Sequence, residues 1–143
     1  MTSAPQTILV PFDGSANAKR ALQHAIEIAG RTGDEIHILN VQTPVSGDIA
    51  GFVGSASIKQ YHHDEGDKVL APAKQLLEKV GIVFHAHIGV GQPAPVINEF
   101  ADQLKCTHVV MGTRGYGSAL GLTLGSVANA IVAHVKAPVT LVK

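Results

Sequence analysis

The sequence has no tryptophan, one cysteine and only 4% aromatic residues in a chain of 143. Few aromatic rings leave few stacking platforms for single-stranded nucleic acid, so we do not expect that ligand. The single cysteine, Cys106, cannot form an intramolecular disulfide, which is typical of chains that fold in a reducing compartment. Stability must come from a hydrophobic core, and this length is enough for one domain, residues 1–143.

Charge of one sign and long apolar runs are also lacking. Eleven basic residues balance eleven acidic residues, so the molecule has no overall field that would attract nucleic acid. No run approaches the roughly 18 apolar residues that cross a bilayer, and the N-terminal MTSAPQTILV has no basic segment followed by a long apolar one. We therefore expect a cytoplasmic protein without a membrane or nucleic-acid partner.

Two kinds of apolar pattern alternate along the chain. Short runs rich in β-branched residues predict strands over 7–12, 35–41, 82–88, 107–111 and 138–143. Apolar residues at helical spacing occupy the segments between them, over 18–29, 69–80, 96–104 and 127–135. Because parallel neighbours need a crossover that a helix supplies, this alternation predicts an α/β fold with an open, mostly parallel five-stranded sheet and helices on both faces.

Glycine and proline positions refine this prediction. Gly33 and Gly81 follow helical patterns where a left-handed cap is expected, and Pro93 lies where a helix would begin. Pro72 falls inside a helical pattern and should kink or break that helix.

The segment 42–57, QTPVSGDIAGFVGSAS, is rich in glycine and has no period. We predict a long mobile loop that ends near a capping box at Ser57 and Gln60. Such a loop could act as a lid or serve only as a solvated connection.

A second unusual segment is 111–129, MGTRGYGSALGLTLGSVAN, between a predicted strand and a predicted helix. Gly112, Gly115 and Gly125 allow a ligand to approach the backbone closely, and Ser126 is expected to be the N-cap of the last helix. The free amides at a helix N-terminus bind phosphate well. The spacing therefore indicates a phosphate site held mainly by the main chain.

Other phosphate motifs fit less well. A P-loop needs lysine after its last glycine, but Ser126 follows Gly125 here. The run GVGQPA, 89–94, has a loose dinucleotide spacing without the acidic residue expected about 20 positions later, so we interpret it as a tight turn into a helix.

Three motifs together resemble the universal stress protein family, and specifically its ATP-binding branch, from about Thr7 to Lys143. They are ILVPFDGS at the end of the first strand, NV at the end of the second, and the spaced glycine run described above. The resemblance implies a Rossmann-like fold of the adenine nucleotide alpha hydrolase type, with strand order 3-2-1-4-5. That order brings the ends of the first and fourth strands together, at a crevice where open α/β sheets bind ligands.

The resemblance also implies which residues contact ATP. Adenine and ribose would lie against Pro11, Asp13 and Val41, with Met111 and Gly112 as the floor. The phosphates would be held by four residues, chiefly through backbone amides: Gly115, Gly125, Ser126 and Val127. Arg114 is a secondary candidate for the phosphates, and Mg²⁺ is an expected companion of the nucleotide.

Several residues have two interpretations. Asp13 could accept from a ribose hydroxyl or hold a metal-bound water, or it could only form an Asx turn. His85 and His87 alternate in one strand and could ligate zinc, with His62 or His63 nearby, or could be ordinary strand histidines. Cys106 precedes the fourth strand at the end away from the ligand, which favours a packed thiol over a nucleophile.

No nucleophile, base and acid occur in a recognisable setting, so we predict a nucleotide-binding regulator of the stress response with at most slow ATP hydrolysis. A phosphoacceptor receiver domain is a rival with the same winding, but the third strand ends in HAHIGVG, without the aspartate that such a domain needs. The alternative function is that of a family member that binds no nucleotide and acts through dimerisation and protein contacts. In either case the resemblance implies a homodimer through the last strand, Val139 to Val142.

Overall fold

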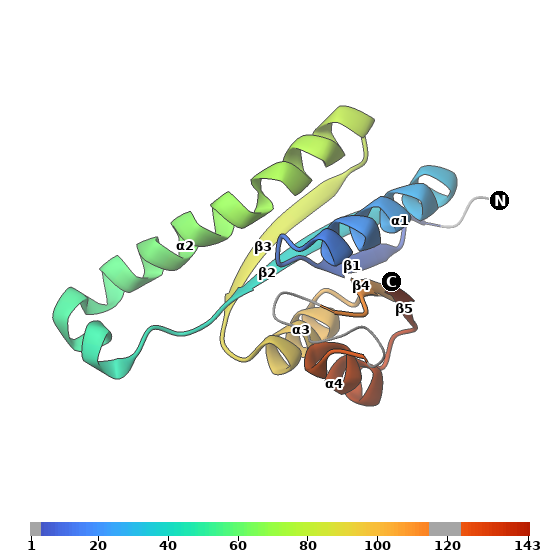
Figure 1. The fold of residues 1–143 in the computed structure, drawn as a ribbon. Helices are drawn as coiled ribbons and strands as arrows, with labels where there is room; N and C mark the ends of the chain where they lie inside the picture. The colour runs from blue at the N-terminus through green and yellow to red at the C-terminus, as the bar shows by residue number, and fades with distance from the viewer. Residues whose placement is uncertain (1–3, 115–123) are drawn as a thin grey trace.

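The computed structural model describes residues 4–114 and 124–143. Its five strands form one parallel sheet in the order β3-β2-β1-β4-β5, which confirms the predicted fold class and strand order (Figure 1). The strands are β1 (Thr7–Pro11), β2 (Glu35–Gln42), β3 (Phe84–Val90), β4 (His108–Gly112) and β5 (Val139–Val142).

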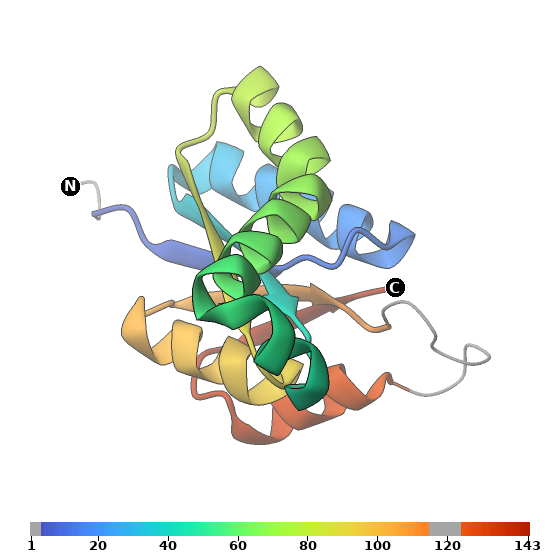
Figure 2. The same ribbon diagram turned by 90° about the vertical axis from the view of Figure 1, so that its left-hand side faces the viewer.

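Helices cover both faces of this sheet (Figure 2). One core lies under α1 (Ala16–Thr32) and α2 (Gly47–Val80), and a second lies under α3 (Pro93–Gln103) and α4 (Ser126–His134). Alternate residues of each central strand serve the two cores, since Val10 joins the first and Leu9 the second, both with 0% exposure. Burial on both faces explains why the two central strands, β1 and β4, have continuous apolar runs.

The helix ends predicted at Gly33, Gly81 and Pro93 are confirmed. Gly33 and Gly81 end α1 and α2 in the left-handed conformation, with φ of 78° and 75°, which glycine adopts without steric cost. Pro93 occupies the first position of α3. At the start of α1, the Ser15 hydroxyl accepts from the Ala18 amide at 3.1 Å.

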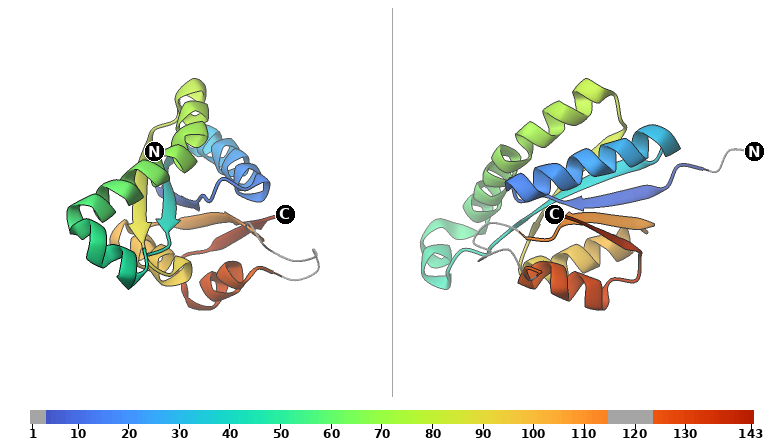
Figure 3. Two further views of the ribbon diagram at one scale, coloured as in Figure 1. Left: turned by 60° about the vertical axis from the view of Figure 1, so that its left-hand side comes forward. Right: turned by 45° about the vertical axis from the view of Figure 1, so that its right-hand side comes forward.

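The prediction of a long loop over 42–57 is wrong, because α2 already begins at Gly47 (Figure 3). Ser46 is its N-cap and accepts from the Ile49 amide at 3.4 Å. Two helical stretches meet at Gly54, whose φ of 76° and ψ of 161° are not helical. Ser57 and Gln60 lie inside the helix and form no capping box.

Pro72 does not break α2, since the residue with non-helical angles is Gly54. Pro72 is exposed, so the carbonyl that loses its helical partner can bond to water.

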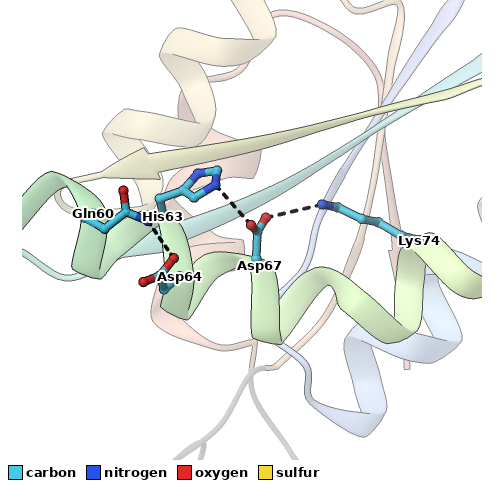
Figure 4. A network of polar contacts seen from close by, with 5 residues as sticks. All are labelled: Gln60, His63, Asp64, Asp67 and Lys74. Carbon is cyan, nitrogen blue, oxygen red and sulfur yellow. Dashed lines mark hydrogen bonds and ion pairs between the residues drawn. The ribbon is translucent and has the colours of Figure 1, made fainter.

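Polar side chains on the outer surface of α2 also span this position. Asp67 accepts from Lys74 Nζ at 3.2 Å and contacts His63 Nε2 at 3.1 Å (Figure 4). Gln60 and Asp64 form a further pair at 2.8 Å (Figure 4). Such exposed pairs each add only about 0.2–1 kcal/mol.

Across the described residues, none of the helices combines the length and the apolar character that a membrane span requires.

Candidate functional site

A cavity of about 340 Å³ opens where β1 and β4 end and α4 begins. Nine of the ten predicted site residues line it: Pro11, Asp13, Val41, Met111, Gly112, Arg114, Gly125, Ser126 and Val127. The tenth, Gly115, lies outside the described residues. The structure thus brings residues from four separate segments to one cavity, although their contact with a nucleotide stays a prediction.

The turn after β1 forms one wall. The backbone amide of Ser15 donates to Asp13 Oδ1 at 2.9 Å, so the Asx turn is present. Asp13 itself is exposed at the rim of the cavity. The Asx turn therefore fixes the Asp13 carboxylate beside the cavity.

Asn40 holds that wall against β2, and sequence reasoning missed it. The side chain is only 4% exposed, and its Nδ2 donates to the Phe12 carbonyl at 3.0 Å. Its Oδ1 accepts from Gln42 Nε2 at 2.6 Å. The NV motif thus contains, next to Val41, a buried amide that fixes the chain after Pro11.

Asn17 was also missed, and it organises the other wall. This side chain is 7% exposed, and its Oδ1 accepts from the Arg114 amide at 2.6 Å and from the Thr113 hydroxyl at 3.4 Å. Its Nδ2 donates to the Val142 carbonyl at 2.7 Å. One buried amide therefore connects α1, β5 and the first residues after β4.

Gly112 is required by this arrangement. A Cβ at Gly112 would lie 2.6 Å from Asn17 Oδ1 and 3.2 Å from the Arg114 carbonyl oxygen. Because Gly112 has no side chain, Asn17 Oδ1 can reach the Arg114 amide just after β4. The two ends of the glycine-rich segment are also joined, because the Gly125 amide donates to the Thr113 carbonyl at 2.8 Å.

The prediction that Ser126 caps α4 is wrong by one residue. Gly125 is the N-cap, with an extended φ of −63° and ψ of 160°, and its carbonyl accepts the first helical bond from the Asn129 amide at 3.0 Å. Ser126 is the first helical residue. Its amide and that of Val127 belong to the first turn, where backbone donors have no partner within the helix.

The run 89–94 is a packed turn, as interpreted. A Cβ at Gly89 would lie 2.6 Å from Val96 Cγ1, so the glycine lets α3 approach the sheet closely. The Gly91 amide donates to the Gln42 carbonyl at 3.0 Å. Pro93, at the start of α3, contributes to the cavity wall.

Cys106 lies just before β4, at the end of the strand away from the cavity, and packs against the second core. Burial raises the pKa of its thiol to about 11. At neutral pH the side chain is therefore a protonated, packed thiol.

The histidine prediction is partly wrong. His85 and His87 do share a face, but they meet His37 of β2 on the side of the sheet that carries α3. His62 and His63 belong to α2, which packs on the opposite face. The strand register pairs His37 with His85, which the sequence alone could not show.

Comparison with known proteins agrees with the fold. A model described as the Universal stress protein family matches residues 5–143. A universal stress protein of Methanocaldococcus jannaschii is 33% identical over 142 residues, covering 95% of this chain and 81% of that protein. The solved structure of MJ0577, a protein whose function was assigned from its structure, matches with a TM-score of 0.82 at 26% identity, covering 96% of this chain and 95% of that one.

Two further solved structures contain nucleotides. A universal stress protein in complex with cAMP has a TM-score of 0.70 at 26% identity and covers 99% of this chain and 98% of its own. The universal stress protein of Archaeoglobus fulgidus in complex with dAMP has a TM-score of 0.68 at 25% identity, with 100% of both chains covered. The resemblance noted in the sequence motifs is confirmed: this chain belongs to the universal stress protein family.

Proposed function

We propose that this chain binds ATP in the cavity between β1, β4 and α4, and acts as a small cytoplasmic regulator of the stress response. The observation that carries the proposal is the meeting of Asp13, Gly112 and the first turn of α4 around one space. Such a space has walls for a flat base and backbone donors for phosphate. The related structures with cAMP and dAMP support an adenine nucleotide as the ligand.

Each wall has a proposed partner in the nucleotide. Pro11, Asp13 and Val41 would contact adenine and ribose, above a floor made by Gly112 and Met111, which is 5% exposed. The phosphates would lie at the α4 N-terminus, and the residues proposed to hold them are Gly115, Gly125, Ser126 and Val127. Arg114, which lines the same cavity, would be a further phosphate contact.

Mg²⁺ would accompany ATP at this site. Mg²⁺ is commonly held by one or two carboxylates together with substrate phosphates. Asp13 supplies a carboxylate at the rim, held in place by its Asx turn. The donor set therefore fits the ion, which would neutralise phosphate charge.

The charged groups in the described lining are Asp13 and Arg114. Rapid phosphoryl transfer needs groups that position water and stabilise charge on the leaving phosphate. One carboxylate, one guanidinium and backbone amides suit binding better than hydrolysis. We therefore propose at most slow ATP hydrolysis.

The alternative is a family member that binds no nucleotide and acts through dimerisation and protein contacts. β5 is an edge strand whose residues are all half-buried, so a second copy could pair with it. We propose a homodimer through Val139–Val142 in either case. The open cavity, with nine of the predicted residues around it, favours the nucleotide-binding function.

The decisive experiment is to denature the purified protein, identify any released nucleotide by chromatography, and titrate the nucleotide-free protein with ATP and Mg²⁺ by calorimetry. The proposal expects saturable binding. A blank extract followed by no binding heat would favour the alternative.

A matched pair of variants tests the position of the phosphates. Gly125→Val should weaken ATP binding by about 1–3 kcal/mol, because a side chain would crowd the amides at the helix start. Gly30→Ala, in an open position of α1 with no atom within 4 Å of its Cβ, should leave the affinity unchanged. Ser126→Ala should have a smaller effect than Gly125→Val, because the backbone donors remain. Equal affinities in all three variants would contradict the phosphate assignment.

A further inference from the structure

Four ionisable side chains gather on β2 and β3, away from the nucleotide cavity. Glu35 and His37 lie on β2, and His85 and His87 lie on β3, with His37 directly opposite His85 in the parallel register. Because side chains alternate along a strand, all four project from the same face of the sheet. We call this group the histidine cluster.

The contacts within the histidine cluster are close. The His37 ring stacks on His85 with centroids 4.6 Å apart and on His87 with centroids 5.1 Å apart. His37 Nδ1 and His87 Nε2 share a hydrogen bond of 2.8 Å, and His85 Nε2 lies 3.7 Å from Glu35 Oε2. One ligand atom from each of Glu35, His37 and His85 can be chosen so that all lie within 4.8 Å of one another.

The cluster is a surface feature with a packed base. The side chains of His85 and Glu35 are 51% and 39% exposed, so an ion can reach them from solvent. On the inner side, the centroid of the His87 ring lies 5.6 Å from the centroid of the Phe100 ring of α3. His87 thus anchors the base of the group, while Glu35 and His85 form its open side.

The two inner rings of the cluster, His37 and His87, are partly buried. Burial, with His87 and His85 nearby, lowers the pKa of His37 to about 4. Burial, and after it His85, also lowers the pKa of His87.

We propose that Glu35, His37 and His85 bind one divalent transition-metal ion of the zinc class on the β2–β3 surface. Two imidazoles and a carboxylate, completed by water, form a common four-coordinate zinc donor set. His37 would ligate through Nε2, because its Nδ1 already bonds to His87. Metal-bound histidines typically donate their other ring N–H in this way, so His87 becomes a positioning residue.

Binding requires one local movement. The rings of His37 and His85 are stacked with 26° between their planes, whereas two ligands of one tetrahedral ion point their lone pairs at a common centre. His85 is half exposed and can turn its ring towards that centre. The ion would then connect β2 to β3, which is the edge strand of the sheet.

This site is separate from the nucleotide cavity. Leu39 is the β2 residue of the described cavity lining that lies nearest to His37, two residues away or about 7 Å along an extended strand, and the lining includes none of the four cluster residues. The proposal does not depend on nucleotide binding. Its failure would leave the proposed function untouched.

The test uses the full, tag-free protein, first stripped with a chelator and without nucleotide. Calorimetric titration with ZnCl₂ should show one ion per chain with a dissociation constant in the micromolar range or tighter, and Co²⁺ should give the visible absorption of a four-coordinate site. Zinc should also raise the melting temperature, and chelator should reverse the rise. Less than one equivalent of bound zinc would overturn the proposal.

Matched variants locate the ion. His85→Gln and Glu35→Gln alter exposed side chains, so both should fold, and each should abolish the stoichiometric uptake or weaken it at least tenfold. His87→Gln should keep one ion per chain with an affinity about 10–100-fold lower, as for other positioning residues. His134→Gln, at an exposed histidine of α4, should bind like the parent. If His85→Gln and Glu35→Gln bound zinc as tightly as His134→Gln, the assignment would be wrong.

Discussion

At the scale of single residues, two buried amides do most to shape the candidate site. Asn40 fixes the turn after β1, and Asn17 fixes the chain after β4. A buried amide that lost its partners would leave backbone groups unsatisfied, at a cost of about 1–3 kcal/mol. Neither residue stands out in the sequence, because an asparagine near a helix start or strand end is equally common as a simple capping or turn residue. Their partners become visible only when distant segments are placed side by side.

Gly112 gives the first prediction at this scale. Gly112→Ala should lower the free energy of unfolding by about 1–3 kcal/mol, because the new Cβ would lie 2.6 Å from Asn17 Oδ1 and 2.7 Å from its Cγ. Gly30→Ala is the control, since its Cβ would meet nothing within 4 Å and alanine favours a helix by about 1 kcal/mol. Urea denaturation measures both. A Gly112→Ala variant as stable as the parent would show that Asn17 can move aside at no cost.

Cys106 gives a prediction about pH. Its pKa of about 11 in the fold lies above the reference value of 9.0, so the fold favours the protonated thiol. This contribution to stability is fully present below pH 9.0 and is lost as the pH rises through about 11. At pH 8, iodoacetamide should therefore alkylate the native protein at least about tenfold more slowly than the urea-unfolded chain, because the thiolate is the nucleophile. Mass spectrometry follows the reaction, with Cys106→Ser as the blank; equal native and unfolded rates would contradict the packed thiol.

At the scale of elements, the strands and the four helical stripes were predictable because each buries a periodic face. The strand boundaries shift by at most two residues, as at β3, which the pattern predicts over 82–88 and which spans Phe84–Val90. The start of α2 was not predictable for a physical reason. Ile49, Phe52 and Val53 are exposed there, Phe52 to 91%, so this part of the helix has no buried face to create a period.

The packing of α2 on β3 depends on a glycine. A Cβ at Gly66 would lie 2.6 Å from Ile88 Cδ1 and 2.7 Å from its Cγ1, so helix and strand approach closely at that point. Gly66→Ala should push α2 away from the sheet and cost about 1–3 kcal/mol of unfolding free energy. Gly51→Ala, earlier in the same helix with nothing within 4 Å of its Cβ, should be neutral or slightly stabilising. Thermal unfolding would compare them, and an equal effect of the two substitutions would argue against this contact.

At the scale of the whole molecule, the sequence motifs placed the cavity correctly because parallel strands end on the same side of their sheet. What they could not supply was register. The alternation of His85 and His87 indicated a shared face, but the third ring, His37, comes from a strand 50 residues away in sequence from His87. Long-range pairing of this kind depends on the whole sheet, so the histidine cluster had to await the structure.

The proposed homodimer is tested at the same scale. Pro138 and Val142 direct their carbonyls towards β4, so the alternation of the strand turns the N–H groups of Val139 and Leu141 to the open edge. Leu141→Pro removes one of these donors and should give a monomer in native mass spectrometry at micromolar concentration, where the parent should be a dimer. Val132→Lys, at an exposed apolar position on α4, should remain dimeric. Circular dichroism must show that Leu141→Pro is folded. A monomeric parent, or a dimeric and folded Leu141→Pro, would contradict the interface.

Asn17 also has a consequence beyond its own surroundings. Its oxygen holds the Arg114 amide at the mouth of the cavity, and its nitrogen holds the Val142 carbonyl in the outermost strand. If a ligand shifted the chain after β4, this one side chain would connect that shift to β5. If a ligand at the cavity raised the affinity of two copies for each other, thermodynamic reciprocity would require the dimer to bind that ligand more tightly than the monomer does, by the same factor. Ligand binding to the cavity and dimerisation through β5 would then be coupled equilibria.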